Sequence, residues 1–327
     1  MKPRIVLAGV ILLAAGLAAG CGKAGAPGKV ALRAADVHPF GYPTTDALRV
    51  MADAVTQKSG GRIAIEIHAG ETMGGEKETI ELTKVGTLDI NRTSAAPLAE
   101  FAPEFGVYSL PYLFRDAGHM WKVLEGPIGR ELLDALEKYG FVGLCYYDSG
   151  ARSFYNRKRP IRTPRDLRGL KIRVQQNPVM QDCVKALGAS PTPMGFGEVY
   201  AALQSGMIDG AENNAPSYEN TKHYEVAPYF SLDEHSRIPE VVICSKKRWD
   251  RLSQADRALL RDAAQASVAE QRRLWNAYDK KATDVLRQAK VKINRPDQVA
   301  FREASESVYR RYGKQFADLV RRIREVK

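Results

Sequence analysis

The stretch GLKIRVQQNPV, residues 169–179, decides the fold class. Leu170, Ile172 and Val174 alternate with charged residues, which is the period-two pattern of a β-strand with one apolar face. The segment after it begins with a proline and ends in Gly188, which is typical of a helix. A βαβαβ order is therefore predicted. Its expected elements are a strand at 170–176, a helix at 178–188, a short strand at 189–195, a helix at 197–206 and a strand at 207–213.

The same order of elements occurs nearer the N-terminus. The junction LTKVGTLDI (82–90) matches ALQSGMIDG (202–210) in its helix, its glycine and its aspartate. Such a duplication predicts two similar α/β lobes that face one another, each a mixed, mostly parallel sheet with flanking helices. The alternative is that a helix–glycine–strand junction is common in any α/β protein. The expected elements of the first repeat are strands at 30–37, 62–68 and 88–94 and helices at 44–57 and 76–86.

The other segments connect and brace the two lobes. Residues 101–140 are predicted to be mostly helical, and residues 146–167 to form a proline-punctuated loop that crosses between the lobes. Residues 254–289 contain neither glycine nor proline. One helix of about 50 Å is expected there, spanning both lobes, with a kinked pair of helices as the alternative. The predicted division is 30–150 plus 239–278 for lobe I and 151–238 plus 279–327 for lobe II.

The N-terminus predicts export. Lys2 and Arg4 precede an apolar run that ends in small residues, so residues 1–20 are expected to be a signal peptide. Small residues directly before Cys21 favour lipidation of that cysteine, and residues 21–29 then form a flexible tether. A plain cleavage site with an incidental cysteine is the alternative. The expected location is periplasmic, with a lipid anchor if Cys21 is modified.

Composition and motifs exclude several classes of function. The formal net charge is +11, but the basic residues are scattered among acidic ones, which favours an anionic ligand over nucleic acid. Catalytic and metal-binding motifs are not found, and GETMGGEK (70–77) lacks the lysine of a phosphate-binding loop. The five histidines are dispersed, and Cys145 and Cys244 lie in apolar runs typical of buried thiols. We therefore expect a binding protein with no cofactor and no metal, and not an enzyme.

Several blocks carry a family resemblance. GLKIRVQQNPV, GASPTPMGFGEVYAALQSGMIDGAENN and YEVAPYFSLDEHSRIPE together resemble the solute-binding proteins of tripartite ATP-independent periplasmic (TRAP) transporters, the family of C4-dicarboxylate-binding proteins. SLPYLFRD (109–116) and GARSFYN (150–156) fit the same family. The resemblance implies a monomeric, two-lobed clamp with a long helix along its back. It also implies an organic-acid ligand and, as partners, membrane permease subunits driven by an ion gradient.

The resemblance also implies site residues. Arg173 corresponds to the arginine that forms a salt bridge to the ligand carboxylate, a role that suits the planar guanidinium fork. Arg152 corresponds to a second ligand-facing arginine, with a hinge salt bridge as the alternative. The other implied contacts are Asn213, its neighbour Asn214, Phe196 and Glu76, for which the alternatives are a core aromatic at Phe196 and a helix N-terminal charge at Glu76.

Two further residues bear on the ligand. Arg92 adds a third cation in the first lobe, and His38 places a polar group just after the first strand; an ordinary structural role is the alternative for each. Together with Glu76 they suit a ligand that bears a carboxylate and several hydroxyls, such as a uronate or an aldonate. The other functions to be weighed are an exported sugar-acid lyase or hydrolase that uses His38 or His119 with Glu76, and a binding subunit for an ATP-driven importer or a sensor.

Overall fold

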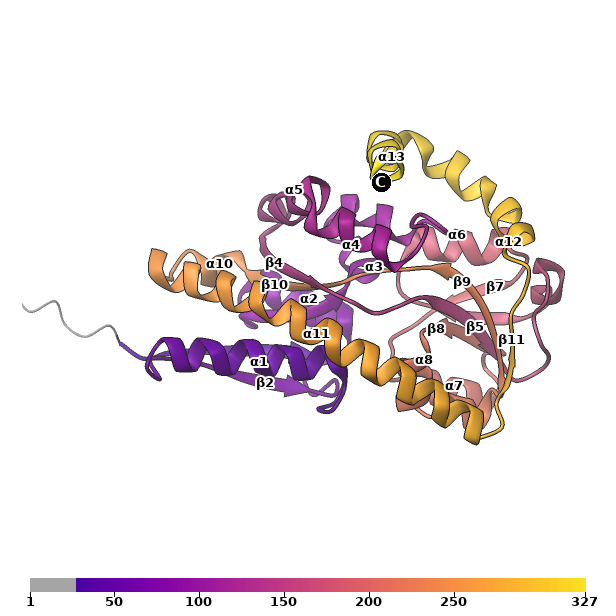
Figure 1. Cartoon of the computed structure of the whole chain (residues 1–327), viewed down its shortest axis with the longest axis horizontal. Helices are drawn as coiled ribbons and strands as arrows, with labels where there is room; N and C mark the ends of the chain where they lie inside the picture. The colour runs from indigo at the N-terminus through magenta and orange to yellow at the C-terminus, as the bar shows by residue number, and fades with distance from the viewer. Residues whose placement is uncertain (1–27) are drawn as a thin grey trace, which may run out of the picture.

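The computed structural model describes residues 28–327, and it contains two mixed sheets with helices around them (Figure 1). Each sheet forms the centre of one lobe, which confirms the predicted α/β fold class. The predicted signal peptide and Cys21 lie outside the described residues. Within residues 28–327 no helix is both long enough and apolar enough to cross a membrane.

Lobe I is built on a five-stranded sheet of order β2-β1-β3-β10-β4. The strands β1, β2 and β3 are parallel, whereas β10 runs antiparallel to both β3 and β4. The elements of the repeat are β1 (Val30–Asp36), α1 (Pro43–Lys58), β2 (Ile63–Ala69), α2 (Glu76–Val85) and β3 (Ile90–Ser94). They are followed by α3 (Ala95–Leu98), η1 (Pro103–Ser109), α4 (Ala117–Glu125), α5 (Pro127–Ala135), η2 (Leu136–Tyr139) and β4 (Phe141–Tyr147).

Lobe II is built on a six-stranded sheet of order β11-β9-β5-β8-β6-β7. Its parallel strands β7-β6-β8 have the same order as β2-β1-β3, with the first strand of the repeat in the middle. The elements of the repeat are β6 (Lys171–Val174), α6 (Pro178–Ala186), β7 (Ser190–Pro193), α7 (Val199–Ser205) and β8 (Gly210–Asn213). They are followed by α8 (Ala215–Asn220), α9 (His223–Val226) and β9 (Tyr229–Ser236).

The two repeats also share the way in which their second helix ends. Gly86 after α2 has φ 85°, and Gly206 after α7 has φ 78°, so each helix stops in the left-handed conformation that glycine adopts at little cost. A residue with a Cβ would be strained at both positions. The glycine that first suggested the duplication is therefore required by the backbone in both lobes.

The chain crosses between the lobes along a two-stranded ribbon. It leaves lobe I from β4 into β5 (Arg152–Asn156) and returns from β9 into β10 (Glu240–Ser245). Since β4 pairs with β10 and β5 pairs with β9, both crossings lie side by side. The short connections between these strands are where the two sheets meet.

The prediction of a loop over residues 146–167 is wrong in part. β5 lies inside this range and is a central strand of the second sheet, paired with β8 and β9. All five of its residues are buried, and Arg152 and Asn156 stand where an apolar pattern would be expected. A short strand that begins and ends with buried polar residues has no clear period-two hydrophobic signal, so the sequence pattern missed it. The only helical turn in the rest of the range is η3 (Pro164–Leu167).

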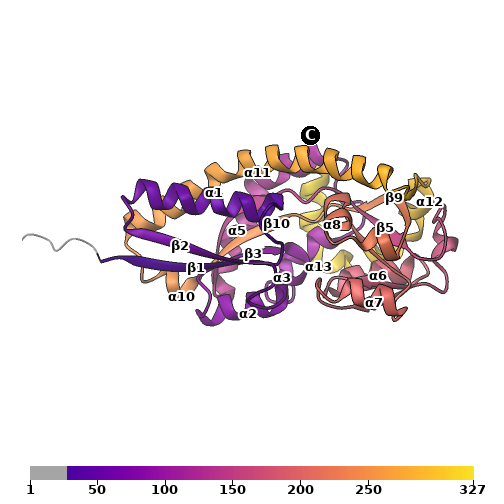
Figure 2. The same cartoon turned by 90° about the horizontal axis from the view of Figure 1, so that it is seen from below.

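The segment after β10 forms the predicted long helix. After α10 (Lys246–Trp249), α11 (Gln254–Gln288) is a single helix of 35 residues. It packs against α1 and β4 of lobe I and against α8 of lobe II. Figure 2 shows it running along one side of the whole molecule, on the side opposite α2 and α7. The single-helix prediction is confirmed, and the kinked pair is not found.

The C-terminal elements complete the core. β11 (Lys292–Asn294) adds to the edge of the second sheet, and α12 (Gln298–Ala304) leads into α13 (Glu306–Glu325). α13 packs against α5 and η1 of lobe I and α6 of lobe II, so it too bridges the lobes. Phe316 and Ile323 of α13 are buried in a core shared by both lobes. Cys145, Cys183 and Cys244 are free and buried, as predicted for the first and the last.

Candidate ligand-binding site

A small pocket lies between the two lobes, at the C-terminal ends of β1, β3, β6 and β8. Parallel α/β sheets place their ligands at this end of the strands, because the loops that follow the strands converge there. The lining residues are Val37, His38, Glu76, Arg92, Arg152, Arg173, Gln175, Phe196, Asn213, Asn214, Ser217 and Glu240. All eight side chains singled out in the sequence are thus brought together in one pocket.

Arg173 is a buried cation without an acidic partner. Its Nε and Nη2 both donate to the Met194 carbonyl oxygen, at 3.1 and 2.8 Å. The side chain is only 3% exposed, and burial lowers the pKa of its guanidinium from the usual value. Among residues 28–327 no carboxylate lies within ion-pair distance of it. A guanidinium stays charged even so, and its remaining nitrogen has no partner in the described chain.

Arg152 belongs to a chain of alternating charges in lobe II. Its Nε and Nη2 donate to the two carboxylate oxygens of Glu212, at 2.6 and 2.9 Å. Glu212 is completely buried, and although burial works against its ionisation, Arg152 and His235 together lower its pKa to about 2. Asp233 accepts from the His235 Nδ1 at 2.9 Å, and its charge, with that of Glu212, outweighs burial and raises the pKa of His235 to about 9. Arg152 therefore lines the pocket and also forms the salt bridge given as its alternative.

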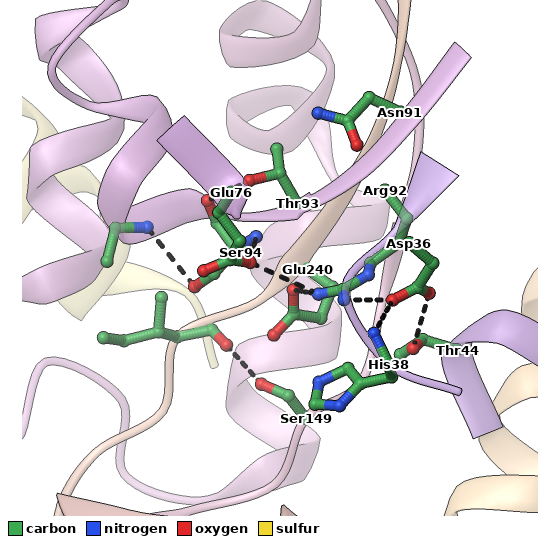
Figure 3. A network of polar contacts seen from close by, with 12 residues as sticks. Asp36, His38, Thr44, Glu76, Asn91, Arg92, Thr93, Ser94, Ser149 and Glu240 are labelled. Carbon is green, nitrogen blue, oxygen red and sulfur yellow. Dashed lines mark hydrogen bonds and ion pairs between the residues drawn. The ribbon is translucent and has the colours of Figure 1, made fainter. Parts of the chain in front are cut away.

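Arg92 is surrounded by carboxylates (Figure 3). It forms ion pairs with Asp36, with Glu240 at 2.5 Å and with Glu76 at 3.4 Å. Burial works against its charge, but Asp36 and Glu240 outweigh that cost and raise the pKa of Arg92 well above its usual value. Arg92, predicted as a third cation for the ligand, lines the pocket, but protein carboxylates already neutralise its charge.

An aromatic wall closes one side of the pocket. The His38 ring stacks on Tyr42 with a centroid distance of 3.8 Å and an interplanar angle of 16°. Phe196 of lobe II meets His38 edge-on at 5.1 Å. Burial, reinforced by Arg92, lowers the pKa of His38 to about 3, so the ring is neutral, and its Nδ1 has no hydrogen-bond partner in the described chain.

The two asparagines have different local roles. Asn214 is the N-cap of α8, because its Oδ1 accepts from the Ser217 backbone N–H at 2.7 Å. Asn213 is the last residue of β8, and its Oδ1 accepts from the Asn214 backbone N–H at 2.9 Å. The cap explains why Asn214 is buried in this position, while the remaining amide group of each side chain is left for the pocket.

Several hydrogen bonds join the lobes across the pocket and its rim, among them one in which the Ser94 hydroxyl donates to the Gln175 side-chain oxygen at 3.5 Å. The Tyr42 hydroxyl lies 2.8 Å from the Ser217 hydroxyl. Gln175 donates to Glu76 at 3.2 Å, and Asn177 donates to the Ala96 carbonyl oxygen at 2.8 Å. At the rim the Gly197 backbone N–H donates to Glu71 at 3.0 Å. The protein is therefore in a closed conformation.

Sequence reasoning missed some of the lining residues and suggested one that lies elsewhere. Gln175 follows Arg173 by two residues, so the period of β6 is a signal that points to it. Ser217 and Glu240 have no comparable local signal, because α8 and β10 bring them to the pocket through the tertiary fold. His119, weighed above as a catalytic residue, lies on α4 and bonds the Ile323 carbonyl oxygen at 2.9 Å, away from the pocket.

Two larger hollows flank α11. One includes Trp275 and Asp279, and another includes Trp121 and Arg272. Neither contains any of the predicted site residues. Within residues 28–327 no group of three or more metal-ligating side chains comes together.

Comparison with known proteins gives a consistent result. The family model described as bacterial extracellular solute-binding protein, family 7 (DctP), matches residues 34–315. Three solved TRAP periplasmic solute-binding proteins align over most of the chain. The Xanthobacter autotrophicus Py2 protein, with bound β-D-galacturonate, is 42% identical, with a TM-score of 0.88 and coverage of 90% of this chain and 100% of that one.

The other two are similar to the same degree. The Bradyrhizobium sp. BTAi1 protein, in complex with α/β-D-galacturonate, is 45% identical, with a TM-score of 0.87 and coverage of 89% of this chain and 98% of that one. The Pseudomonas putida F1 protein, with bound D-glucuronate, is 37% identical, with a TM-score of 0.89 and coverage of 91% and 98%.

Proposed function

The chain belongs to family 7 of the bacterial extracellular solute-binding proteins, the DctP family of TRAP transporters, and we propose that its ligand is a hexuronate held by Arg173. Members of this family bind organic acids and work with TRAP permeases, and they are not enzymes. That membership excludes the lyase, hydrolase and ATP-driven importer functions weighed from the sequence. The ligand and the residues that hold it are the subject of the proposal.

The single observation that carries the proposal is the unpaired charge of Arg173. Leaving a buried cation without a counter-ion is costly, so such a group is kept only where another charge arrives. A carboxylate matches the guanidinium geometry and gains charge-assisted hydrogen bonds of about 1.5–3 kcal/mol each. Arg152 stands on the same lobe, and the amide groups of Asn213 and Asn214 line the pocket beside it.

The rest of the pocket favours a polyhydroxylated molecule over a short dicarboxylate. Glu240 can accept a hydrogen bond from a ligand hydroxyl, and Phe196 with His38 offers apolar ring faces to the C–H groups of a sugar. Three similar proteins hold galacturonate or glucuronate in their solved structures. A hexuronate supplies both a carboxylate for lobe II and hydroxyls for lobe I.

The proposal extends to location and assembly, and the family and the N-terminal sequence support it. We place the mature protein in the periplasm, where it closes on the ligand as a monomer and presents it to the permease. Lipidation of Cys21 would hold it at the membrane through the tether 21–29. We divide the chain into lobe I, 30–150 with 239–278, and lobe II, 151–238 with 279–327, because the strands of each sheet fall within these ranges.

Isothermal titration of the mature protein with D-galacturonate, D-glucuronate, D-gluconate and succinate tests the proposal. The uronates should bind best, and Arg173→Ala should weaken uronate binding about 100-fold or more, from the loss of charge-assisted bonds. Arg173→Lys should restore only part of the affinity, because an ammonium lacks the fork. Arg165→Ala, which removes an exposed cation from the same lobe, is the control. Absence of uronate binding, or unchanged binding in Arg173→Ala, would contradict the proposal.

A further inference from the structure

The two sides of the pocket carry opposite charge excesses. On lobe I the three carboxylates of Asp36, Glu76 and Glu240 share a single guanidinium, that of Arg92. On lobe II Arg152 pairs with the carboxylate of Glu212, whereas Arg173 has no ion-pair partner among the described residues. A molecule between the lobes therefore meets a positive wall on one side and a negative wall on the other.

Glu240 is the part of the negative wall with a free oxygen. Its Oε2 is bound to Arg92 at 2.5 Å, and its Oε1 makes no hydrogen bond with any described residue. The carboxylate oxygens of Glu76, by contrast, are engaged by the Ser94 backbone N–H at 2.8 Å and by Gln175 at 3.2 Å. In Figure 3 one oxygen of Glu240 points to Arg92 and the other points away from it. Glu240 comes from the first position of β10 and lines the pocket.

We propose that Glu240 is a specificity-determining residue, which accepts a ligand hydroxyl and, with Glu76 and Asp36, excludes sugar acids that carry a second carboxylate at the far end. This inference rests on the proposed function and adds which sugar acids the pocket rejects. Aldarates, which have the same carbon skeleton as uronates but a carboxylate at each end, are the compounds excluded.

Selectivity is the difference between the binding free energies of two ligands, and here the two ligands differ in one group, a hydroxyl or a second carboxylate. A hydroxyl donates a hydrogen bond to a carboxylate oxygen, whereas a second carboxylate has no proton to donate and meets three like charges. Like charges brought together in a desolvated site cost several kcal/mol. The single cation on this side, Arg92, has its Nη1 and Nη2 already bound to protein carboxylates and offers no compensation.

The neighbouring carboxylates also affect the pKa of Glu240. Burial, the charge of Glu76 and the charge of Asp36 together outweigh Arg92 and raise the pKa of Glu240 to about 7. The charged groups that face Glu240 are Arg92 from β3, Asp36 from β1, Glu76 from α2 and, across the pocket, Arg152 from β5. The neighbourhood already resists one further negative charge, so a ligand carboxylate placed there meets the same resistance.

A set of three ligands separates charge from shape. D-Galacturonate is the cyclic monocarboxylate, D-galactonate the open-chain monocarboxylate and galactarate the open-chain dicarboxylate of the same skeleton. Titration of the mature protein near about pH 8.5, where Glu240 is ionised, should give galactarate an affinity at least about 100-fold below that of galactonate. The ratio of the affinity for galactonate to the affinity for galactarate should fall about 10-fold or more in Glu240→Gln, because the variant lacks one of the repelling charges.

Two further measurements keep the test independent of one variant. In the wild-type protein the same ratio should fall as the pH is lowered to about 5.5, because Glu240 then binds a proton. Glu76→Gln should also lower the ratio, and Glu104→Gln, which removes a lobe I carboxylate that pairs with Lys138 outside the pocket, should leave it unchanged. Circular dichroism shows which variants are folded.

The outcomes distinguish this inference from the proposed function. If the monocarboxylates bind but galactarate binds as tightly as galactonate, or if neither carboxylate variant changes the ratio, the inference is overturned and the proposed function stands. If galactonate and galactarate both bind weakly and equally, and Glu240→Gln changes neither affinity, the pocket selects for the sugar ring. That result would also overturn the inference. If no monocarboxylate binds, the proposed function fails and the inference fails with it.

Discussion

Arg173 and Arg92 are both buried arginines of the pocket, but their surroundings give them different uses. Arg92 has three protein carboxylates around it, and removing it leaves those charges together in a buried site. Arg173 has only the carbonyl oxygen of Met194, and removing it relieves an uncompensated charge. At the residue scale, therefore, one arginine is bound by the fold, and the other is the one that we propose for the ligand carboxylate.

This contrast predicts opposite effects on stability. Arg92→Met should lower the free energy of unfolding of the ligand-free protein by about 3–5 kcal/mol, the usual result of breaking a buried ion pair from one side. Arg173→Met should leave it unchanged or raise it, while ligand affinity is lost. Urea unfolding without ligand measures both. An equal loss of stability in the two variants would show that Arg173 is also needed by the fold.

Glu240 predicts a pH dependence of stability. Its folded pKa, raised to about 7 by burial and by Glu76 and Asp36, lies above the unfolded value of 4.5. Between these values the folded state holds a proton that the unfolded state has lost, so this group makes stability fall as the pH rises. Urea unfolding measures the free energy of unfolding of the wild type and of Glu240→Gln. These two free energies should differ less at about pH 5.5 than at about pH 8.5, and the variant should be the more stable protein at the higher pH. If the wild type instead becomes more stable relative to Glu240→Gln as the pH rises, the prediction is wrong.

The sequence identified the pocket residues that local motifs carry. Arg173, Asn213 and Phe196 lie in the repeated blocks, and Gln175 was within reach of the strand period. Glu240 and the neutralisation of Arg92 could not be predicted, because both depend on which strands become neighbours in the first sheet. Charge in a pocket is a property of the assembled cluster and not of any one segment.

At the scale of elements, two substitutions of Asn214 separate its capping of α8 from its proposed contact with the ligand. As N-cap of α8 it accepts from the Ser217 N–H, and as a pocket residue it offers its amide to a ligand. Asn214→Ala should lower the free energy of unfolding by about 1 kcal/mol, whereas Asn214→Ser keeps a capping oxygen and should restore most of that loss. Urea unfolding gives the first effect, and uronate titration of the serine variant isolates the loss of the amide. If serine and alanine unfold alike, the cap is not what the side chain contributes.

Long, strongly patterned elements were the ones that the sequence predicted well. α11 was foreseen because its 35 residues include neither glycine nor proline, and α2 and α7 because glycine ends them in the left-handed conformation. β5 was missed because its five buried residues include Arg152 and Asn156. Those polar residues serve the pocket and the loop beyond it, so functional chemistry at this strand overrides the hydrophobic period.

At the scale of the whole molecule, the two lobes are joined by the ribbon of crossing strands and by the helices α11 and α13. The duplication made two facing lobes predictable, but not how they approach. The contacts between the lobes include hydrogen bonds whose partners are far apart in sequence, such as Tyr42 with Ser217. Relative placement of lobes depends on such long-range pairs, which leave no periodic signal in the chain.

The contact at the rim gives a test of closure. Glu71 has φ 60°, a left-handed conformation that is strained for a residue with a side chain, and its Oε1 accepts from the Gly197 N–H at 3.0 Å. A Cβ at position 197 would lie 2.1 Å from Glu71 Oε2 in the closed state. Gly197→Ala should therefore disfavour closure, lower uronate affinity about 10-fold and speed dissociation, as measured by titration and stopped-flow release.

A double variant distinguishes this steric effect from a local fault in lobe II. Glu71→Gly removes the obstructing carboxylate and suits the positive φ, and it should lose the rim hydrogen bond and the negative charge that interacts with Arg173. With the carboxylate absent, adding Gly197→Ala should cost little more, and the double variant should bind about as well as Glu71→Gly alone. Gly313→Ala, where a Cβ meets open space, is the control for a glycine substitution. If the double variant binds as weakly as Gly197→Ala, the alanine acts within lobe II and the Glu71 contact does not govern closure.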